Sequence, residues 1–287
     1  MIILNRQHPI RNPDGRAIAQ KTDKRIVVAD FEFQTDYEKY LDYLKSDGSS
    51  AHPKPRWPYA KIVCGSWVEI QFPAGDEAKP VVGPFQSLCA PDMEEIDIAN
   101  HFFTKVLGKA ADDGSLPRLV TYAGDFKDNE VLRRVAMCWG ITLPPQLRST
   151  DPRCPMRLDL CEDCFTEQIG GVHLSEYAQA QGLPGKLYPG LDIGKHIAAG
   201  DWETVEEQCA HDVLLTAIIA ARRLASCGEI GQTGKACARA IIDRYCERAP
   251  SVSTRRWKAW RDENLGHREI LTLRGRPAAM FRAGRQS

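Results

Sequence analysis

The chain has 287 residues, of which 43% are hydrophobic and 26% charged, and its 38 Lys and Arg residues balance its 38 Asp and Glu residues. These proportions are typical of a soluble globular protein and exclude a wholly disordered chain, which would be poorer in apolar residues and unbalanced in charge. No apolar run approaches the roughly 20 residues of a membrane span and no secretory signal is present at the start, so we expect a cytoplasmic protein without a membrane partner.

The first predicted element is a strand over residues 25–33, whose sequence RIVVADFEF is apolar and rich in β-branched residues. Because side chains alternate along a strand, Asp30 and Glu32 share one face with Ile26 and Val28. Carboxylates inside an apolar strand need a cationic partner or a metal, because an unpaired buried charge is costly. A DxE pair at a strand end can hold a hard divalent cation, and the alternative is a polar strand end with a salt bridge.

The remaining segments predict a mixed sheet with helices on its faces. A polar stretch with three prolines predicts a loop after the first strand. The next two predicted strands are joined by a short link, which favours antiparallel pairing. In chain order, the later predicted elements are strands over 60–72 and 80–88, a helix from Asp92 to 107, a strand over 119–122, a helix over 131–139, a strand over 157–160, a helix over 173–181, and a helix from the N-cap Asp201 through Ile218. Three antiparallel strands followed by strand and helix units indicate an α/β fold.

Three segments of the chain resemble the motifs of one enzyme family. The stretch VVADFEFQT resembles the first motif of the DEDD 3′–5′ exonucleases, the ribonuclease H-like group that includes the proofreading exonucleases of DNA polymerases. The stretch LVTYAGDFKDNEVLRRVAMCWGI resembles the second motif in the branch related to the exonuclease domain of family B DNA polymerases, with Asp128 on the motif's Asp. The stretch GDWETVEEQCAHDVLLTAIIAARRL resembles the third motif, with Asp212 on its Asp. Together with MRLDLCEDC and VHLSEYAQAQGLPGK, the resemblance covers roughly residues 24–230 in order.

The resemblance implies a ribonuclease H-like fold and a two-metal site. Four carboxylates would hold two Mg²⁺ or Mn²⁺ ions that straddle the scissile phosphate, namely those of Asp30, Glu32, Asp128 and Asp212. The implied reaction is hydrolysis of a single-stranded nucleic acid from its free 3′ end, with DNA favoured over RNA. Replication or repair proteins would be the partners in trans.

The third motif departs from the family's pattern around its catalytic helper. In one branch a Tyr lies four residues before the last Asp and helps to orient the attacking water, and here that position is Gln208. A glutamine can hydrogen-bond a water but cannot act as a base, so the role would persist in weakened form. In the histidine-bearing branch a His lies five residues before the last Asp, and here that position is Glu207. His211, which is adjacent to Asp212, is an alternative candidate for the base. A catalytically weakened nuclease-fold module that binds nucleic acid is therefore the alternative function.

The second motif is also irregular. Ala123 stands where Asn is usual, and Lys127 stands where an aromatic residue is usual. Asp125 is a rival ligand if the loop is shifted by three residues. We prefer Asp128, because it keeps the family's spacing to the apolar residues of the following helix.

Ten cysteines amount to about 3% of the chain, well below the composition of a disulfide-built scaffold, and most are expected to be buried thiols. Cys161 and Cys164 form a CxxC, with Cys154 before and His173 after it, from which a Zn²⁺ site can be drawn. Ordinary thiols are the favoured interpretation, because no second close pair completes the site. A zinc-stabilised interaction protein is a third functional class.

The balanced charge conceals two segments of opposite sign. Residues 229–287 contain 13 Lys and Arg against 6 Asp and Glu, whereas residues 1–228 contain 25 against 32. Basic and aromatic residues alternate in this tail at Arg255, Arg256, Trp257, Lys258, Trp260 and Arg261. Such a pattern suits a nucleic-acid strand, and the alternative is a packed helix with its tryptophans in the core. We therefore predict a ribonuclease H-like exonuclease domain over 1–230 and a basic, partly helical extension over 231–287.

Overall fold

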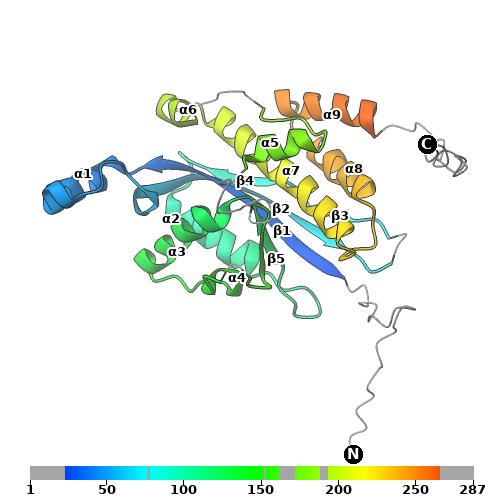
Figure 1. Ribbon diagram of the computed structural model, residues 1–287, viewed down its shortest axis with the longest axis horizontal. Coiled ribbons are helices and arrows are strands. Elements are labelled where there is room, and N and C mark those ends of the chain that lie inside the picture. Colours follow the sequence, from blue (N-terminus) through cyan, green and yellow to red (C-terminus); the bar gives the residue numbers. More distant parts are fainter. Residues whose placement is uncertain (1–22, 76–77, 152, 162–171, 188–192, 266–287) are drawn as a thin grey trace, which may run out of the picture.

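A six-stranded mixed sheet forms the centre of the computed structural model (Figure 1). The structure describes residues 23–75, 78–151, 153–161, 172–187 and 193–265. The strands are β1 (Lys24–Thr35), β2 (Ala60–Phe72), β3 (Val81–Val82), β4 (Gln86–Cys89), β5 (Arg118–Thr121) and β6 (Arg157–Asp159). Their order is β3-β2-β1-β5-β6, and β4 also pairs with β2.

The sheet combines the two predicted modes of pairing. β1 and β2 are antiparallel, whereas β5 is parallel to β1 and β6 is parallel to β5. The strand predicted over 80–88 is divided into β3 and β4 by Gly83 and Pro84, since proline cannot donate to a strand ladder. The predicted α/β class, with a mixed sheet flanked by helices, is confirmed, and the arrangement is compatible with a ribonuclease H-like fold.

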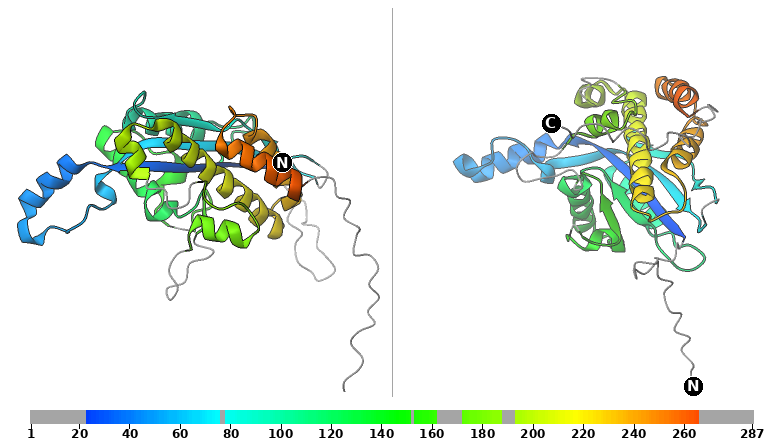
Figure 2. Two further views of the ribbon diagram at one scale, coloured as in Figure 1. Left: turned by 90° about the horizontal axis from the view of Figure 1, so that it is seen from above. Right: turned by 45° about the vertical axis from the view of Figure 1, so that its right-hand side comes forward.

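Helices cover both faces of the sheet (Figures 1 and 2). The helices are α1 (Tyr37–Asp47), α2 (Glu95–His101), the π-helix η3 (Phe102–Leu107), α3 (Asp128–Trp139), α4 (Pro145–Arg148), α5 (Leu174–Ala180), α6 (Ile193–Ala199), α7 (Trp202–Ser226), α8 (Gly234–Tyr245) and α9 (Val252–Asn264). Single 3₁₀ turns are η1 (Gly48–Ser50), η2 (Trp57–Tyr59) and η4 (Gly124–Phe126). Within the described residues, no helix has the length and apolar character to cross a membrane.

The alternation of β1 divides the core into two layers. Val27 and Ala29 pack with α2, η3 and α3 on one face, whereas Ile26 and Val28 pack with α7 on the other. α7 begins where the sequence predicted, because the Asp201 side chain accepts a hydrogen bond from the Thr204 backbone N–H. It then crosses the sheet next to β1 and β2.

The predicted C-terminal extension shares this second layer. Ile241 and Tyr245 of α8 and Trp257 of α9 are buried in the same cluster as the α7 residues Leu214 and Ile218. Within the described residues, α8 and α9 therefore have no separate core and depend on α7 for their burial.

The loop predicted between the first two strands contains a helix. Asp36 caps α1 by accepting a hydrogen bond from the Lys39 backbone N–H, and Tyr40 of α1 is buried. Its ring contacts the ring of Tyr59 from the returning segment, with the centroids 5.4 Å apart. The prediction of a loop relied on the spacing of apolar residues, which reveals neither the side-chain cap nor this long-range ring contact.

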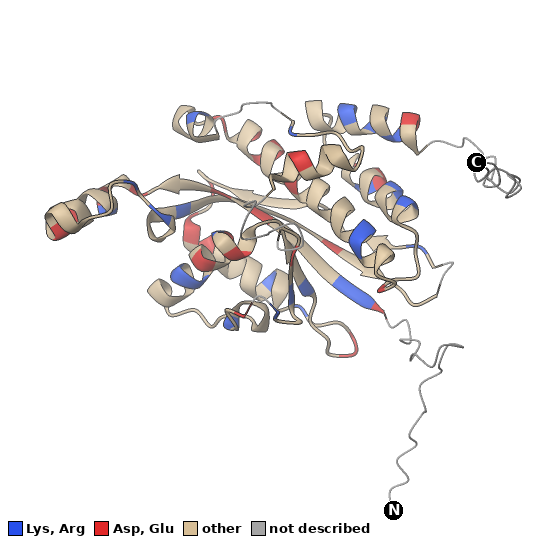
Figure 3. Cartoon of the chain, in the orientation of Figure 1, with Lys and Arg blue, Asp and Glu red and all other residues tan. Residues whose placement is uncertain are grey.

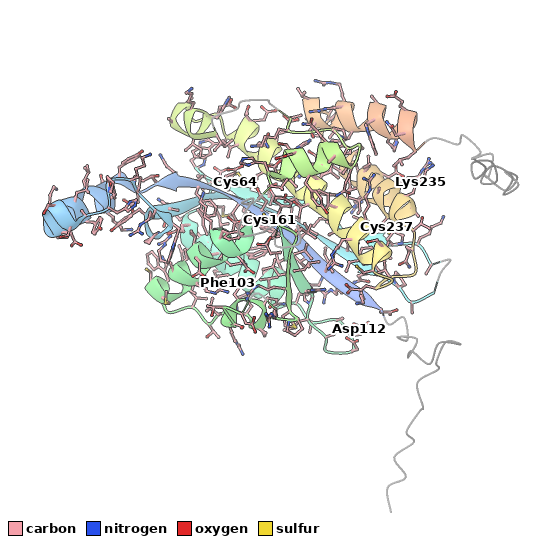
Figure 4. All side chains as sticks on the ribbon, in the orientation of Figure 1. Cys64, Phe103, Asp112, Cys161, Lys235 and Cys237 are labelled. Atoms are coloured by element: carbon pink, nitrogen blue, oxygen red, sulfur yellow. A yellow bond between two sulfur atoms is a disulfide. The ribbon has the colours of Figure 1, made fainter. Side chains whose placement is uncertain are left out.

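Two cysteines differ from the expected reduced thiols. Cys64 of β2 and Cys89 of β4 lie directly opposite each other and form a disulfide. Figure 4 shows Cys64 on the sheet and Cys237 on α8. The described free thiols of Cys161, Cys209, Cys237 and Cys246 are buried, whereas Cys138 and Cys227 are exposed and Cys154 is half-buried, so the prediction that most cysteines are buried thiols is wrong for the described residues.

Candidate functional site

Three carboxylates that are far apart in the sequence meet beside the sheet. One oxygen each of Asp30, Glu32 and Asp212 lie within 4.8 Å of one another. Among the described residues, no other group of three or more His, Cys, Asp or Glu side chains meets this criterion. The three acids line a cavity of about 230 Å³ together with Lys186 and Gln208. Figure 3 shows the acidic residues of β1 and α7 that meet in this part of the molecule.

β1 positions two of these acids through its alternation and its pairing with β2. Asp30 lies opposite Ser66, and Phe31 lies opposite Gly65. A Cβ atom at position 65 would approach the Phe31 ring to 2.7 Å, so glycine allows this ring to pack against the strand. With Phe31 buried in the core on one face, the flanking acids Asp30 and Glu32 turn to the other.

The cluster carries carboxyl groups whose charge is poorly compensated. The pKa of Glu32 is raised to about 7, chiefly by burial and also by Asp212, although Lys127 and Lys186 lower it. Burial also holds the pKa of Asp30 well above its usual range, with smaller contributions from Glu32 and Asp212. A cation placed among these oxygens would remove both effects by stabilising the ionised carboxylates.

Asp128 lies at the start of α3, close to the three-carboxylate group although not a member of it. Its pKa is raised to about 8, chiefly by burial, with Lys127 lowering it and Glu32 and Asp159 raising it. Its rival Asp125 is engaged elsewhere, since Asp125 Oδ1 lies 3.1 Å from Arg157 Nε and accepts a hydrogen bond from the Asn129 amide. These contacts favour Asp128 as the ligand from the second motif.

Asp159 holds the loop that carries Asp128, a role that the sequence analysis did not assign. Its carboxylate accepts hydrogen bonds from the backbone N–H groups of Ala123 at 2.7 Å, Asp125 at 2.9 Å and Cys161 at 2.9 Å. The only signal in the sequence was an acid within the short strand segment MRLDL. Asp159 thus fixes the turn between β5 and α3.

Gln208 and Asp212 project from α7 one helical turn apart and both line the cavity. Gln208 is 5% exposed, and its Oε1 has no hydrogen-bond partner among the described residues. The buried Oδ1 of Asp212 also lacks a hydrogen bond there, with His211 Nδ1 at 3.6 Å as its ion-pair contact. Orphaned oxygens beside two more carboxylates form an all-oxygen donor set, which fits Mg²⁺ or Mn²⁺.

The other candidate bases on α7 lie outside the cavity lining. Glu207 accepts a hydrogen bond from the Ser253 backbone N–H at 2.8 Å, at the start of α9. His211 is fully buried, and its ring centroid lies 6.0 Å from that of Trp257. Both side chains contact α9 and neither lines the cavity, although His211 Nδ1 lies 3.6 Å from Asp212 Oδ1.

Two further residues at the site were missed by the sequence analysis. Lys186 follows the segment GLPG, in which nothing distinguishes it from a solvated lysine, yet it lines the cavity. The Cys209 thiol donates to the Asp30 carbonyl oxygen at 3.4 Å and lies 3.7 Å from Asp30 Oδ2. Burial raises the pKa of Cys209 well above its usual range, so the thiol stays neutral beside the acids.

The tryptophans predicted to contact nucleic acid are engaged within the protein. Trp257 is fully buried, so its indole is not accessible to a base, and Trp260 Nε1 donates to the Gly182 carbonyl at 3.2 Å. Arg256 donates to the Lys186 carbonyl, and Arg261 pairs with Asp243 and Asp262. Arg255 and Lys258 are exposed.

The residues considered for zinc are not gathered in the described part of the chain. Cys164 lies outside the described residues, Cys161 is buried, and His173 is exposed at the start of α5. The described members Cys154, Cys161 and His173 form no metal-ligating group.

No protein-family model matches the chain, and no curated protein matches it. Among solved structures, the chain is similar to the family B DNA polymerase from the hyperthermophilic archaeon Pyrobaculum calidifontis, with 15% sequence identity and a TM-score of 0.45. The match covers 78% of this chain and 29% of that chain, so the protein corresponds to less than a third of that polymerase's length.

Proposed function

We propose that the protein is a divalent-metal-dependent 3′–5′ exonuclease that hydrolyses single-stranded nucleic acid, with DNA favoured over RNA. The observation that supports this proposal is the meeting of Asp30, Glu32 and Asp212 in one cavity wall. Among the described residues, no Lys or Arg forms an ion pair with any of the three, which leaves their charge available to cations.

The side chains of the cavity suit hydrolysis of a phosphodiester. Asp30, Glu32 and Asp212, with Asp128 beside them, would bind two Mg²⁺ or Mn²⁺ ions. Bound divalent ions would polarise the attacking water and offset the charge that develops on the phosphate. Gln208 can hydrogen-bond that water and orient it, and the ammonium of Lys186 provides a positive charge in the same wall.

The basic C-terminal extension is proposed to contribute to strand binding. Arg255 and Lys258 are its exposed bases on α9, and the arginines beyond residue 265 lie outside the described residues. Its tryptophans support the packing of α9 against α5 and α7, so its contact with the strand would be electrostatic.

A catalytically weakened module that binds nucleic acid is the second candidate, and Gln208 is the observation that favours it. An amide has no proton-accepting nitrogen or ionisable oxygen, so Gln208 cannot take a proton from water. In this alternative the same cavity would bind a strand end without cleaving it at a useful rate.

Hydrolysis of end-labelled strands tests the proposal. 5′-labelled single-stranded DNA and RNA oligonucleotides are incubated with Mg²⁺, Mn²⁺ or a chelator, and we expect a metal-dependent ladder of shortened products. Asp30→Ala is expected to abolish the ladder. The matched control is Asp112→Ala, which removes an exposed acid in the loop before β5 (Figure 4). Strand binding without cleavage under every metal would reject the exonuclease and support the second candidate.

A further inference from the structure

A projecting arm, residues 36–59, joins β1 to β2 and contains α1, η1 and η2. Figures 1 and 2 show α1 and its connections standing clear of the body in every view. The arm extends from the same end of β1 as Asp30 and Glu32, because Thr35, three residues beyond Glu32, is the last residue of that strand.

The arm is held together by its own packing. The ring centroids of Tyr40 and Tyr59 lie 5.4 Å apart, and those of Tyr43 and Tyr59 lie 5.6 Å apart. The Tyr40 hydroxyl donates to the His52 carbonyl at 2.9 Å, and the His52 backbone N–H donates to the Tyr43 hydroxyl at 2.9 Å. These contacts fix the segment that returns to β2 against α1.

The two sides of the arm differ in charge. The α1 side holds all of its acids, and Asp36 and Asp42 form ion pairs with Lys39 and Lys45. The returning side has no acid between Asp47 and Glu69. We call residues 52–61 of this side the return segment, HPKPRWPYAK.

The return segment presents unpaired bases and one accessible indole. Lys54, Arg56 and Lys61 are exposed and form no ion pair within the described residues. Trp57 is 37% exposed and lies between Pro55 and Pro58, whose rings restrict the backbone on both sides. A pre-organised aromatic side chain flanked by cations is the combination that binds single strands, where bases stack and phosphates meet positive charge.

The register of β1 and β2 places the end of this segment, Lys61, near the carboxylates. Lys61 lies opposite Gln34, which is two residues beyond Glu32, or about 7 Å along the strand. Phe33 and Ile62 pack into the core with α2 and α3. Alternation therefore turns Gln34 and Lys61 toward the face on which Asp30 and Glu32 lie.

We propose that the return segment binds single-stranded nucleic acid a few nucleotides away from the 3′ end held at the carboxylates. Lys54, Arg56 and Lys61 contact phosphates, and Trp57 stacks on a base. This inference rests on the proposed nucleic-acid substrate, and it assigns to the arm the aromatic contact that the buried Trp257 does not offer.

Binding of oligothymidylate tests the arm independently of catalysis. Fluorescence anisotropy of 5′-fluorescein dT20 and dT4 is measured with chelator present, so that no hydrolysis occurs, at several salt concentrations. We expect Trp57→Ala to weaken dT20 binding about tenfold with an unchanged salt slope, because it removes a stacking contact. The triple variant Lys54→Ala/Arg56→Ala/Lys61→Ala is expected to reduce the salt slope by about 2, since each phosphate contact contributes about 0.7 for single strands. Both variants should lose part of the affinity gained between dT4 and dT20.

The control variant lies on the other side of the same arm. Lys39→Ala/Lys45→Ala removes two lysines that are paired with the acids of α1 and is expected to bind dT20 like the wild type. Circular dichroism melting verifies that each variant is folded. If folded Trp57 and triple variants bind dT20 within twofold of the wild type, the arm is not a strand-binding element. That result leaves the exonuclease proposal to its own cleavage assay, just as an absence of cleavage does not alter the binding measured here.

Discussion

In the proposed exonuclease, Gln208 would limit the rate of hydrolysis, because it lines the cavity at a position where a proton-accepting or strongly orienting group would be more effective. Gln208→Tyr is expected to raise kcat on single-stranded DNA about tenfold, since a phenol hydroxyl can orient the attacking water more firmly. Gln208→Ala is expected to lower kcat and to change KM little. Steady-state kinetics on a labelled oligonucleotide measures both. Equal kcat values for all three proteins would show that position 208 does not contact the attacking water.

Ala123 adopts a backbone conformation that is unfavourable for alanine. Its φ is 61° and its ψ is 19°, in the left-handed region where Asn and Gly are favoured. This geometry gives a physical reason for the Asn that is usual at this point in the family that the motif resembles. Ala123→Gly is therefore expected to raise the free energy of unfolding by about 1 kcal/mol, as measured by urea denaturation.

The matched control for this prediction is an exposed alanine in a right-handed helix. Ala259→Gly in α9 is expected to lower the free energy of unfolding by about 1 kcal/mol, because glycine is a poorer helix former than alanine. A destabilised Ala123→Gly protein would contradict the assignment of strain to this turn.

At the scale of single elements, α9 combines a buried face with an exposed side that carries Arg255 and Lys258 near its start and Asp262 and Glu263 near its end. Removal of residues from 231 onward would not report on strand contact, because α8 and α9 contribute Tyr245 and Trp257 to the core around α7. Arg255→Ala/Lys258→Ala instead removes exposed charge alone. We expect this variant to bind dT20 several-fold more weakly, with a salt slope reduced by about 1.

The control for α9 is a half-buried arginine of the neighbouring helix α8. Arg244→Ala removes a side chain of α8 that pairs with Glu247 and is expected to leave strand binding unchanged. If Arg255→Ala/Lys258→Ala keeps the wild-type salt slope, the described part of the extension does not contact the strand.

The elements differed in how far the sequence alone could predict them. β1, β2 and the start of α7 were predicted closely, because apolar periodicity and the Asp201 cap are local signals, whereas α7 continues to Ser226, eight residues beyond the predicted Ile218. α1 was predicted as a loop, because its stability comes from the packing of Tyr40 and Tyr43 on Tyr59. Propensity and periodicity do not record such long-range contacts.

At the scale of the whole molecule, the carboxylate cluster is expected to make the stability of the protein depend on pH and on divalent cations. The folded-state pKa values of Glu32, about 7, and Asp128, about 8, lie above their ordinary values near 4. The folded protein therefore binds more protons than the unfolded chain in this range, and its stability decreases as pH rises from about 4.5 to about 8. We expect the metal-free protein to be less stable at pH 8 than at pH 5 by on the order of 2 kcal/mol.

Divalent cations should reverse this loss. Mg²⁺ or Mn²⁺ binds the ionised carboxylates, so it is expected to raise Tm more at pH 8 than at pH 5 in differential scanning calorimetry. Glu32→Gln removes one of the repelling charges, and this variant should melt higher than the wild type at pH 8 without metal and respond less to Mn²⁺. A Tm increase on metal addition that is the same at both pH values and in the variant would contradict metal binding at this cluster.

The sequence by itself indicated β1, β2 and the start of α7, with Asp30 and Glu32 on one face of β1, because these depend on local periodicity and capping. It indicated Asp128 and Asp212 only through the resemblance of their segments to the motifs of a known family. Only the tertiary structure decided which residues share the cavity. It brought Gln208 and Lys186 beside the carboxylates, engaged Asp125 with Arg157, and buried Trp257. The physical reason is that these outcomes depend on which face of an element packs against which neighbour. The packing of segments that are distant in sequence decides whether a polar side chain is exposed, paired or enclosed, and the local sequence does not contain that information.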